Sequence, residues 1–167
     1  VGIMKEIKTF QEREEELIKE GYSFNSDTDT EVIANIIEQE FNNCNDVLLS
    51  LENTLKRVKG SLALAIIDTL DEEKLYFVKR KSPLLIGVSD SAYYLASDAL
   101  PMIKKTNKFV DVLDNQYGYI TSNELVLMEK GSLVNPKYVS RNAELLNSDL
   151  NGYPHYMLKE IEEIPLC

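Results

Sequence analysis

A polar cluster directly before a helix-like segment is the part of this sequence best suited to chemistry. Ser26 to Glu31 reads SDTDTE, and apolar residues then recur at helical spacing as far as Phe41. Thr28 and Glu31 have the S/T-x-x-E spacing of a capping box, in which each side chain accepts a hydrogen bond from the other residue's backbone amide. Asp29 then falls at the first helical position, where the helix dipole stabilises a carboxylate.

Asp29 has two interpretations at this point. The cluster can serve only to begin the helix, because Thr28, Asp29 and Glu31 all suit a helix N-terminus. Alternatively, the helix end holds the Asp29 carboxylate in a fixed position, where it can receive the ammonium group of a small ligand through a charge-assisted contact. The residues alone leave both interpretations open.

The other chemically capable side chains are few. His155 is the only histidine, which excludes any two-histidine metal site. We interpret it as a structural residue at the start of a terminal helix. Cys44 lies between two predicted helices with no histidine nearby in sequence to activate it, so we expect a loop or semi-buried thiol and not a nucleophile. Cys44 and Cys167 have neither disulfide-framework nor metal-ligand spacing, so we expect no metal, no cofactor and a reducing cytoplasm.

The length and charge of the chain limit its partners. Its 167 residues fit one domain. It has 18 Lys and Arg against 28 Asp and Glu, a net charge of -10, which argues against nucleic acid or an anionic membrane as a partner. The basic residues are scattered, and Lys79 to Lys81 form the densest group. No apolar run approaches the ~20 residues of a membrane span.

The pattern of apolar residues predicts helices followed by strands. We expect helices over 10–20, 30–41 and 46–59. SLALAIID, from Ser61, is a continuous apolar run and predicts a strand buried on both faces. Short strands separated by turns follow, with a hairpin at Thr121 to Glu124. Beyond Gly131 we expect mostly loop and then a terminal helix, which gives an α+β layer arrangement.

Several sequence blocks, in order, resemble one enzyme family. They are GYSFNSDTDTEVIANIIEQEF, GSLALAIID, KSPLLIGVSDSAYYLASDAL and YPHYMLKEIEEIP. Together they resemble the glutaminase domain of the glucosamine-6-phosphate synthases, which are glutamine–fructose-6-phosphate transaminases and class II glutamine amidotransferases. The last block argues against another class II amidotransferase such as amidophosphoribosyltransferase.

This resemblance implies a fold, a substrate and a role for two residues. The fold is the four-layer α-β-β-α arrangement of the N-terminal-nucleophile hydrolases, with antiparallel sheets. The complete domain hydrolyses glutamine to supply ammonia for converting fructose 6-phosphate to glucosamine 6-phosphate. By position in the family motif, Asp29 contacts the α-amino group of glutamine, and Gly2 is a candidate for the oxyanion-hole glycine.

The sequence also departs from this family. The family nucleophile is an N-terminal cysteine, whereas this chain begins with Val1. We therefore expect 1–167 to form the C-terminal part of a glutaminase domain, with N-terminal strands missing, no isomerase domain and no catalytic residue of its own. The alternative is a degenerate, non-catalytic binding or interaction module on the same scaffold. Uncovered sheet edges would favour a homo-oligomer.

Overall fold

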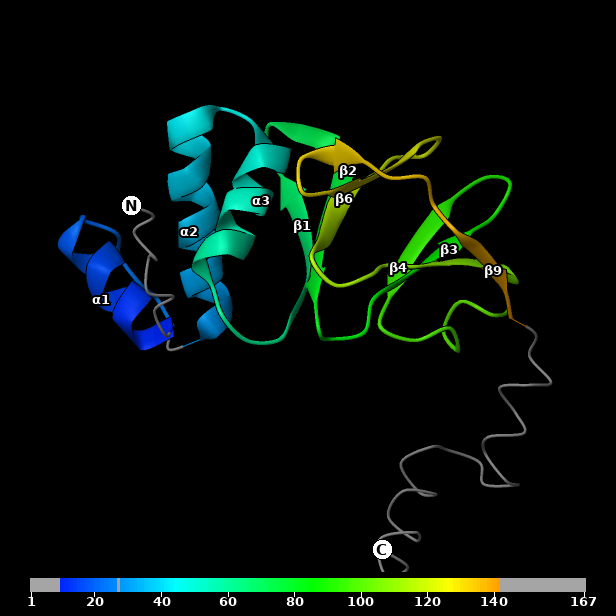
Figure 1. The fold of residues 1–167 in the computed structure, drawn as a ribbon, viewed down its shortest axis with the longest axis horizontal. Helices are drawn as coiled ribbons and strands as arrows, with labels where there is room; N and C mark the ends of the chain where they lie inside the picture. Colours follow the sequence, from blue (N-terminus) through cyan, green and yellow to red (C-terminus); the bar gives the residue numbers. More distant parts are fainter. Residues whose placement is uncertain (1–9, 27, 142–167) are drawn as a thin grey trace, which may run out of the picture.

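A computed structural model describes residues 10–26 and 28–141 of the chain. Within these ranges the predicted order is confirmed, with helices first and short strands after them (Figure 1). None of the helices in the described ranges is long and apolar enough to cross a membrane. The elements are α1 (Phe10–Lys19), α2 (Asp29–Cys44), α3 (Val47–Arg57), β1 (Leu62–Asp68), β2 (Asp71–Arg80), β3 (Leu85–Val88), β4 (Tyr93–Ala96), β5 (Lys108–Asp111), β6 (Gln116–Ile120), β7 (Leu125–Glu129), β8 (Ser132–Leu133) and β9 (Tyr138–Ser140).

The strands form two antiparallel sheets. One sheet has the order β1-β2-β6-β7-β8, and the other has the order β4-β3-β5-β9. The predicted hairpin is confirmed, because β6 and β7 pair and the Thr121 amide donates to the Glu124 carbonyl. The helices lie on one side of the first sheet and the second sheet lies beyond it (Figure 1). The described residues therefore supply an α layer and two β layers.

The first sheet separates two apolar clusters, and β2 contributes to both. Tyr76 and Val78 pack toward the helices, in a cluster that includes Leu17 of α1. Phe77, between them, faces the second sheet and packs with Ile86 in a second cluster. This follows from the two-residue period of a strand, which sends successive side chains to opposite faces.

The prediction that the SLALAIID strand is buried on both faces is wrong. This segment forms β1, which is an edge strand of the first sheet. Leu62 is buried, but Ala63 and Ala65 are exposed, and Ile67 is 71% exposed. The inner face of β1 contacts the helices, and its outer face is uncovered by the described residues. An apolar run shows that a strand forms but not which of its faces another layer covers.

The prediction of mostly loop after Gly131 is wrong in part. Ser132–Leu133 and Tyr138–Ser140 form the short strands β8 and β9 at the edges of the two sheets. Both strands are exposed, so they carry no alternating burial pattern, and they form because β7 and β5 offer free edges for pairing. The predicted terminal helix lies outside the described residues.

Candidate functional site

Asp29 is the first residue of α2, as the sequence predicted, and it is exposed there. Thr28 precedes it in an extended conformation, with φ -97 and ψ 137, and the helix begins directly after it. A carboxylate in the first turn is favoured by the free amides and the positive end of the helix dipole. The helix therefore fixes the Asp29 backbone and leaves its carboxylate available to a ligand.

The predicted capping box is wrong in its partners. The Thr28 side chain makes no cap hydrogen bond. The Glu31 carboxylate accepts from the backbone amides of Asn25 and Ser26, both at 2.8 Å, and from the Ser26 hydroxyl at 2.5 Å. These bonds hold the pKa of Glu31 below its ordinary value, and the bond from the Ser26 side chain has the largest effect. Glu31 therefore stabilises the loop that precedes Asp29 and does not form a capping box with Thr28.

A hollow of about 390 Å³ lies beside Asp29. Its walls come from the start of α2, the start of β1 and two loops, and Ser61, Ser82 and Ser97 contribute hydroxyl groups. A carboxylate with several hydroxyls around a small hollow can bind a ligand that carries both an ammonium group and hydrogen-bonding atoms. Sequence reasoning missed the three serines, because isolated serines far apart in the chain give no pattern.

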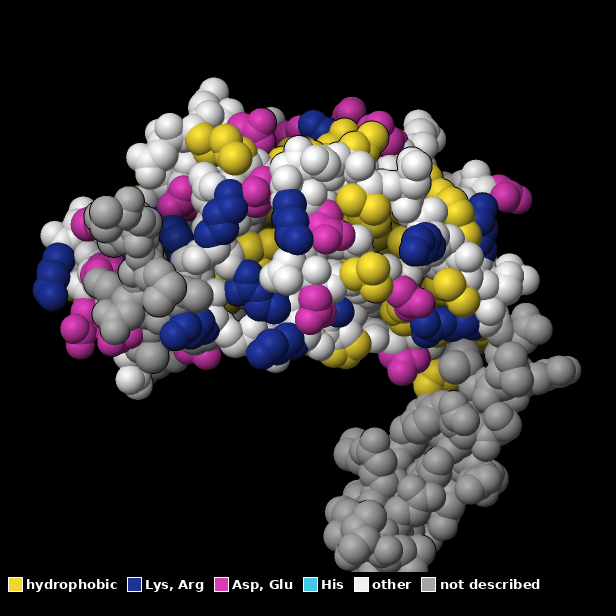
Figure 2. All heavy atoms as spheres, in the orientation of Figure 1, with side chains coloured by type: hydrophobic (Ala, Val, Ile, Leu, Met, Phe, Trp, Pro, Cys, Tyr) yellow, Lys and Arg dark blue, Asp and Glu magenta, His cyan; other side chains and the backbone are white. Residues whose placement is uncertain are grey.

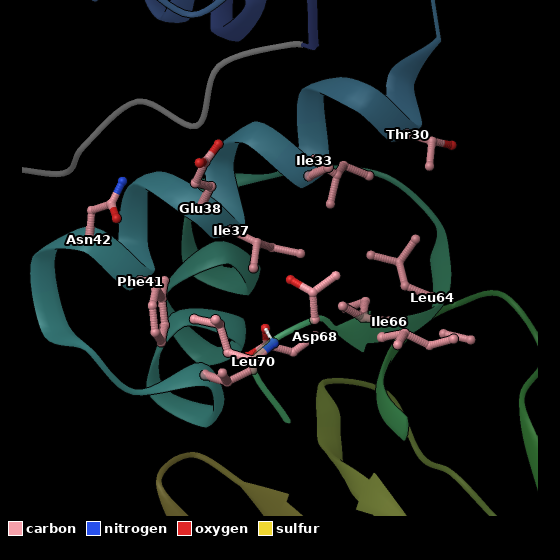
Figure 3. Close-up of a pocket in the computed structure, with 15 residues that line it drawn as sticks. Thr30, Ile33, Ile37, Glu38, Phe41, Asn42, Leu64, Ile66, Asp68 and Leu70 are labelled. Carbon is pink, nitrogen blue, oxygen red and sulfur yellow. Dashed lines mark hydrogen bonds between the residues drawn. The ribbon is translucent and has the colours of Figure 1, made fainter. Parts of the chain in front are cut away.

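A longer apolar groove continues from this hollow between α2 and β1. It has a volume of about 600 Å³ and shares Thr30, Ile33 and Leu64 with the hollow at Asp29. Figure 3 shows Thr30 at one end of α2 and Phe41 near the other, with the side chains of α2 directed toward those of β1. Most of the exposed lining is apolar. The polar end at Asp29 is therefore the part suited to a small charged ligand.

The structure separates Cys44 from Asp29. The two residues stand at opposite ends of the 16-residue helix α2, about 22 Å apart at ~1.5 Å per residue. The Cys44 thiol lies 3.3 Å from both the Asp46 carbonyl and the Ser50 hydroxyl. Cys44 is therefore a structural thiol at the junction of α2 and α3.

Two candidate residues remain. Gly2, the candidate oxyanion-hole residue, and His155 lie outside the described residues. Their roles stay predictions.

Comparison with known proteins places this chain in a class. The family described as "Glutamine amidotransferase domain" matches residues 3–104. The chain therefore belongs to the class II glutamine amidotransferase domain family. The solved structure of glutamine phosphoribosylpyrophosphate amidotransferase from B. subtilis shares the fold, with a TM-score of 0.62 over 71% of this chain and 26% of that chain, at 21% identity.

More similar relatives point to one kind of amidotransferase. The glutamine–fructose-6-phosphate aminotransferase (isomerizing) of Thermococcus kodakarensis is 38% identical over 161 residues, which is 95% of this chain and 27% of the relative. The enzyme of the same name from Bacillus licheniformis is 43% identical over 144 residues, 84% of this chain and 24% of the relative. The chain thus spans about a quarter of the length of these relatives.

Proposed function

We propose that this chain forms part of the glutaminase domain of a glutamine–fructose-6-phosphate aminotransferase, and that Asp29 binds the α-amino group of glutamine. The position of Asp29 carries the proposal, because its carboxylate lies at a helix start on the rim of a hollow lined by hydroxyl groups. The similarity to the named relatives over most of the chain supports the choice of enzyme. The same proposal includes the four-layer α-β-β-α fold for the complete domain and a cytoplasmic location.

The physics of the site suits glutamine. An ammonium group that meets a fixed carboxylate forms a charge-assisted hydrogen bond, which is stronger than a bond between neutral groups. Glu31 holds the loop before Asp29, so little ordering is needed when the ligand binds. The serine hydroxyls provide donors and acceptors for the remaining polar atoms of an amino acid.

The chemical step needs a nucleophile that the described residues do not bring to this hollow. Cys44, the cysteine within the described ranges, is about 22 Å from Asp29 along α2. Since an acyl-enzyme cannot form without a nucleophile at the bound substrate, we propose that the chain as given releases no glutamate from glutamine. Glutamate release by the pure chain that disappears in Cys44→Ala would overturn this part of the proposal.

The test of the binding role is Asp29→Asn, measured by calorimetric titration of the chain with glutamine. The amide keeps the shape of the side chain but loses the charge that pairs with the ammonium group. We expect affinity to fall by roughly 1.5–3 kcal/mol, or about tenfold to a hundredfold. The helix dipole contribution is only ~0.3–1 kcal/mol, so the melting temperature should change little.

Asp90→Asn is the matched control. Asp90 is exposed in a turn between β3 and β4, and its replacement by Asn changes the net charge by the same amount as Asp29→Asn. It should leave glutamine affinity unchanged. Equal glutamine affinity in Asp29→Asn and in the unaltered chain would show that Asp29 only begins α2 and does not bind the ligand.

A further inference from the structure

A second hollow lies on a different part of the molecule, where the end of α3 meets the ends of β2 and β7. Its volume is about 510 Å³. Among the described residues that line it, five are Lys or Arg and only Glu52 is acidic, which leaves a net charge of +4 on the lining of a chain whose net charge is -10. The lining is Glu52, Leu55, Lys56, Val58, Lys59, Gly60, Arg80, Lys81, Asn115, Tyr117 and Lys130.

Arg80 contributes a cation to the lining of this hollow and forms no ion pair with the described residues. Its guanidinium donates to the Val58 carbonyl at 2.6 Å, to the Asn115 side-chain oxygen at 2.7 Å, and to the Leu55 carbonyl. All three acceptors are neutral, so these bonds fix the guanidinium in place without forming an ion pair, and the Asp114 carboxylate acts on its charge only electrostatically. Burial lowers the pKa of Arg80, as expected of a cation that is partly removed from water.

Three exposed lysines, Lys59, Lys81 and Lys130, lie on the rim of the hollow, and their ammonium groups form no ion pair with any described residue. The Asp114 carboxylate accepts from the Lys81 backbone amide and acts on the Lys81 ammonium group only electrostatically. Lys81 and Lys130 have φ values of 61 and 48, in tight turns at the ends of β2 and β7. Such a backbone is uncommon for residues other than glycine, and it fixes where each side chain leaves the turn. The turns therefore bring lysines from separate strands to one rim.

Gathering like charges in one hollow costs electrostatic free energy unless an anion offsets the repulsion. Figure 2 shows several Lys and Arg side chains grouped on the face that α3 covers. The hollow has a floor of Leu55, Val58 and Tyr117, which are buried. Its volume lies within the range of ~300–1,000 Å³ that is usual for small-molecule sites. Concave shape, size and charge together favour a small anion over an extended polyanion.

We propose that this hollow binds a small metabolite through a phosphate or diphosphate group. Lysine ammonium groups bind phosphate as compact point charges, and a fixed guanidinium adds planar hydrogen-bond donors. The site is separate from the Asp29 hollow, with which it shares no lining residue. The proposal therefore does not depend on the glutaminase assignment.

The test is calorimetric titration of the full chain with inorganic pyrophosphate at low ionic strength. We expect saturable binding that weakens as salt is added, because the contacts are between exposed charges. The double variant Lys59→Gln/Lys130→Gln should weaken binding at least about tenfold, since each substitution removes a charge-assisted contact. Circular dichroism melting should show that this variant is folded, because neither lysine makes a side-chain bond to the described residues.

Lys104→Gln/Lys105→Gln is the matched control, with the same change in net charge at two exposed lysines in the turn between β4 and β5. It should change pyrophosphate affinity less than about twofold, clearly below the tenfold loss expected of Lys59→Gln/Lys130→Gln. Equal weakening in both double variants, or no saturable binding to the unaltered chain, would overturn the proposal. Tighter binding of an acidic peptide such as oligoglutamate than of pyrophosphate would also overturn it, in favour of a protein partner.

Discussion

The Tyr117 hydroxyl joins three parts of the first sheet and its helices, and its removal should be costly. Tyr117 is 1% exposed. Its hydroxyl donates to the Glu52 carboxylate of α3 at 2.7 Å and accepts from the Gly131 amide, in the turn after β7, at 3.1 Å. Tyr117→Phe keeps the buried ring but leaves a carboxylate oxygen and an amide without this partner. We expect a loss of about 1–3 kcal/mol in the free energy of unfolding.

The assay is urea unfolding followed by circular dichroism at pH 7, with Tyr119→Phe as the control. Tyr119 lies on the same strand and loses the same atom, but its hydroxyl contacts Glu124 at 3.2 Å in an exposed position. The control should change stability by less than ~0.5 kcal/mol. In a thermal melt, each kcal/mol corresponds to about 2–4 °C for a chain of this size. Equal losses in the two variants would refute the reasoning, because burial of the bond would then not matter.

The pH dependence of the Tyr117 effect follows from two pKa shifts. Burial, followed by the bond to Glu52, raises the pKa of Tyr117 from 10.0 to about 12, so its contribution is complete below pH 10 and is lost as the pH rises toward 12. Hydrogen bonds from Lys56 and then from Tyr117 lower the pKa of Glu52 below 4.5, so its contribution is present above that pH and is lost at lower pH. The stability difference between the chain and Tyr117→Phe should therefore be largest at neutral pH. It should narrow at pH 4 and at pH 11.

Two further substitutions test the sheets. In Gly118→Ala, the added Cβ would lie 1.9 Å from the Val126 carbonyl oxygen on the paired strand β7. We therefore expect urea unfolding to show a loss of at least ~3 kcal/mol in the free energy of unfolding. A variant of unchanged stability would show that β6 and β7 can separate at no cost. We also predict that the chain self-associates through the exposed edge of β1, and that Ile67→Lys, at a side chain that is 71% exposed, shifts light scattering toward the monomer. An unaltered chain that is monomeric at high concentration would contradict this.

The Ser26 to Glu31 cluster shows which features of the site could be predicted from the sequence and which could not. The start of α2 and the place of Asp29 were predictable, because a helix N-terminus depends on residues within about one turn of each other. The partners of Glu31 were not predictable, since they depend on how the chain bends from Asn25 into Ser26 before the helix begins. The serines of the hollow stand directly before β1, after β2 and after β4, and only the tertiary structure brings them together.

By itself, the sequence determined the order of helices and strands, the first residue of α2, and the resemblance to glutaminase domains. These properties depend on neighbours along the chain, on the periods of helix and strand, and on blocks of residues kept in order. Only the tertiary structure decided that β1 is an edge strand with an uncovered face, while β2 is buried on both faces over Tyr76 to Val78. It also decided that lysines that are scattered in sequence meet Arg80 around one hollow. Strand pairing and helix packing bring together residues dozens of positions apart. The local pattern around a residue therefore does not predict which distant residues it will contact.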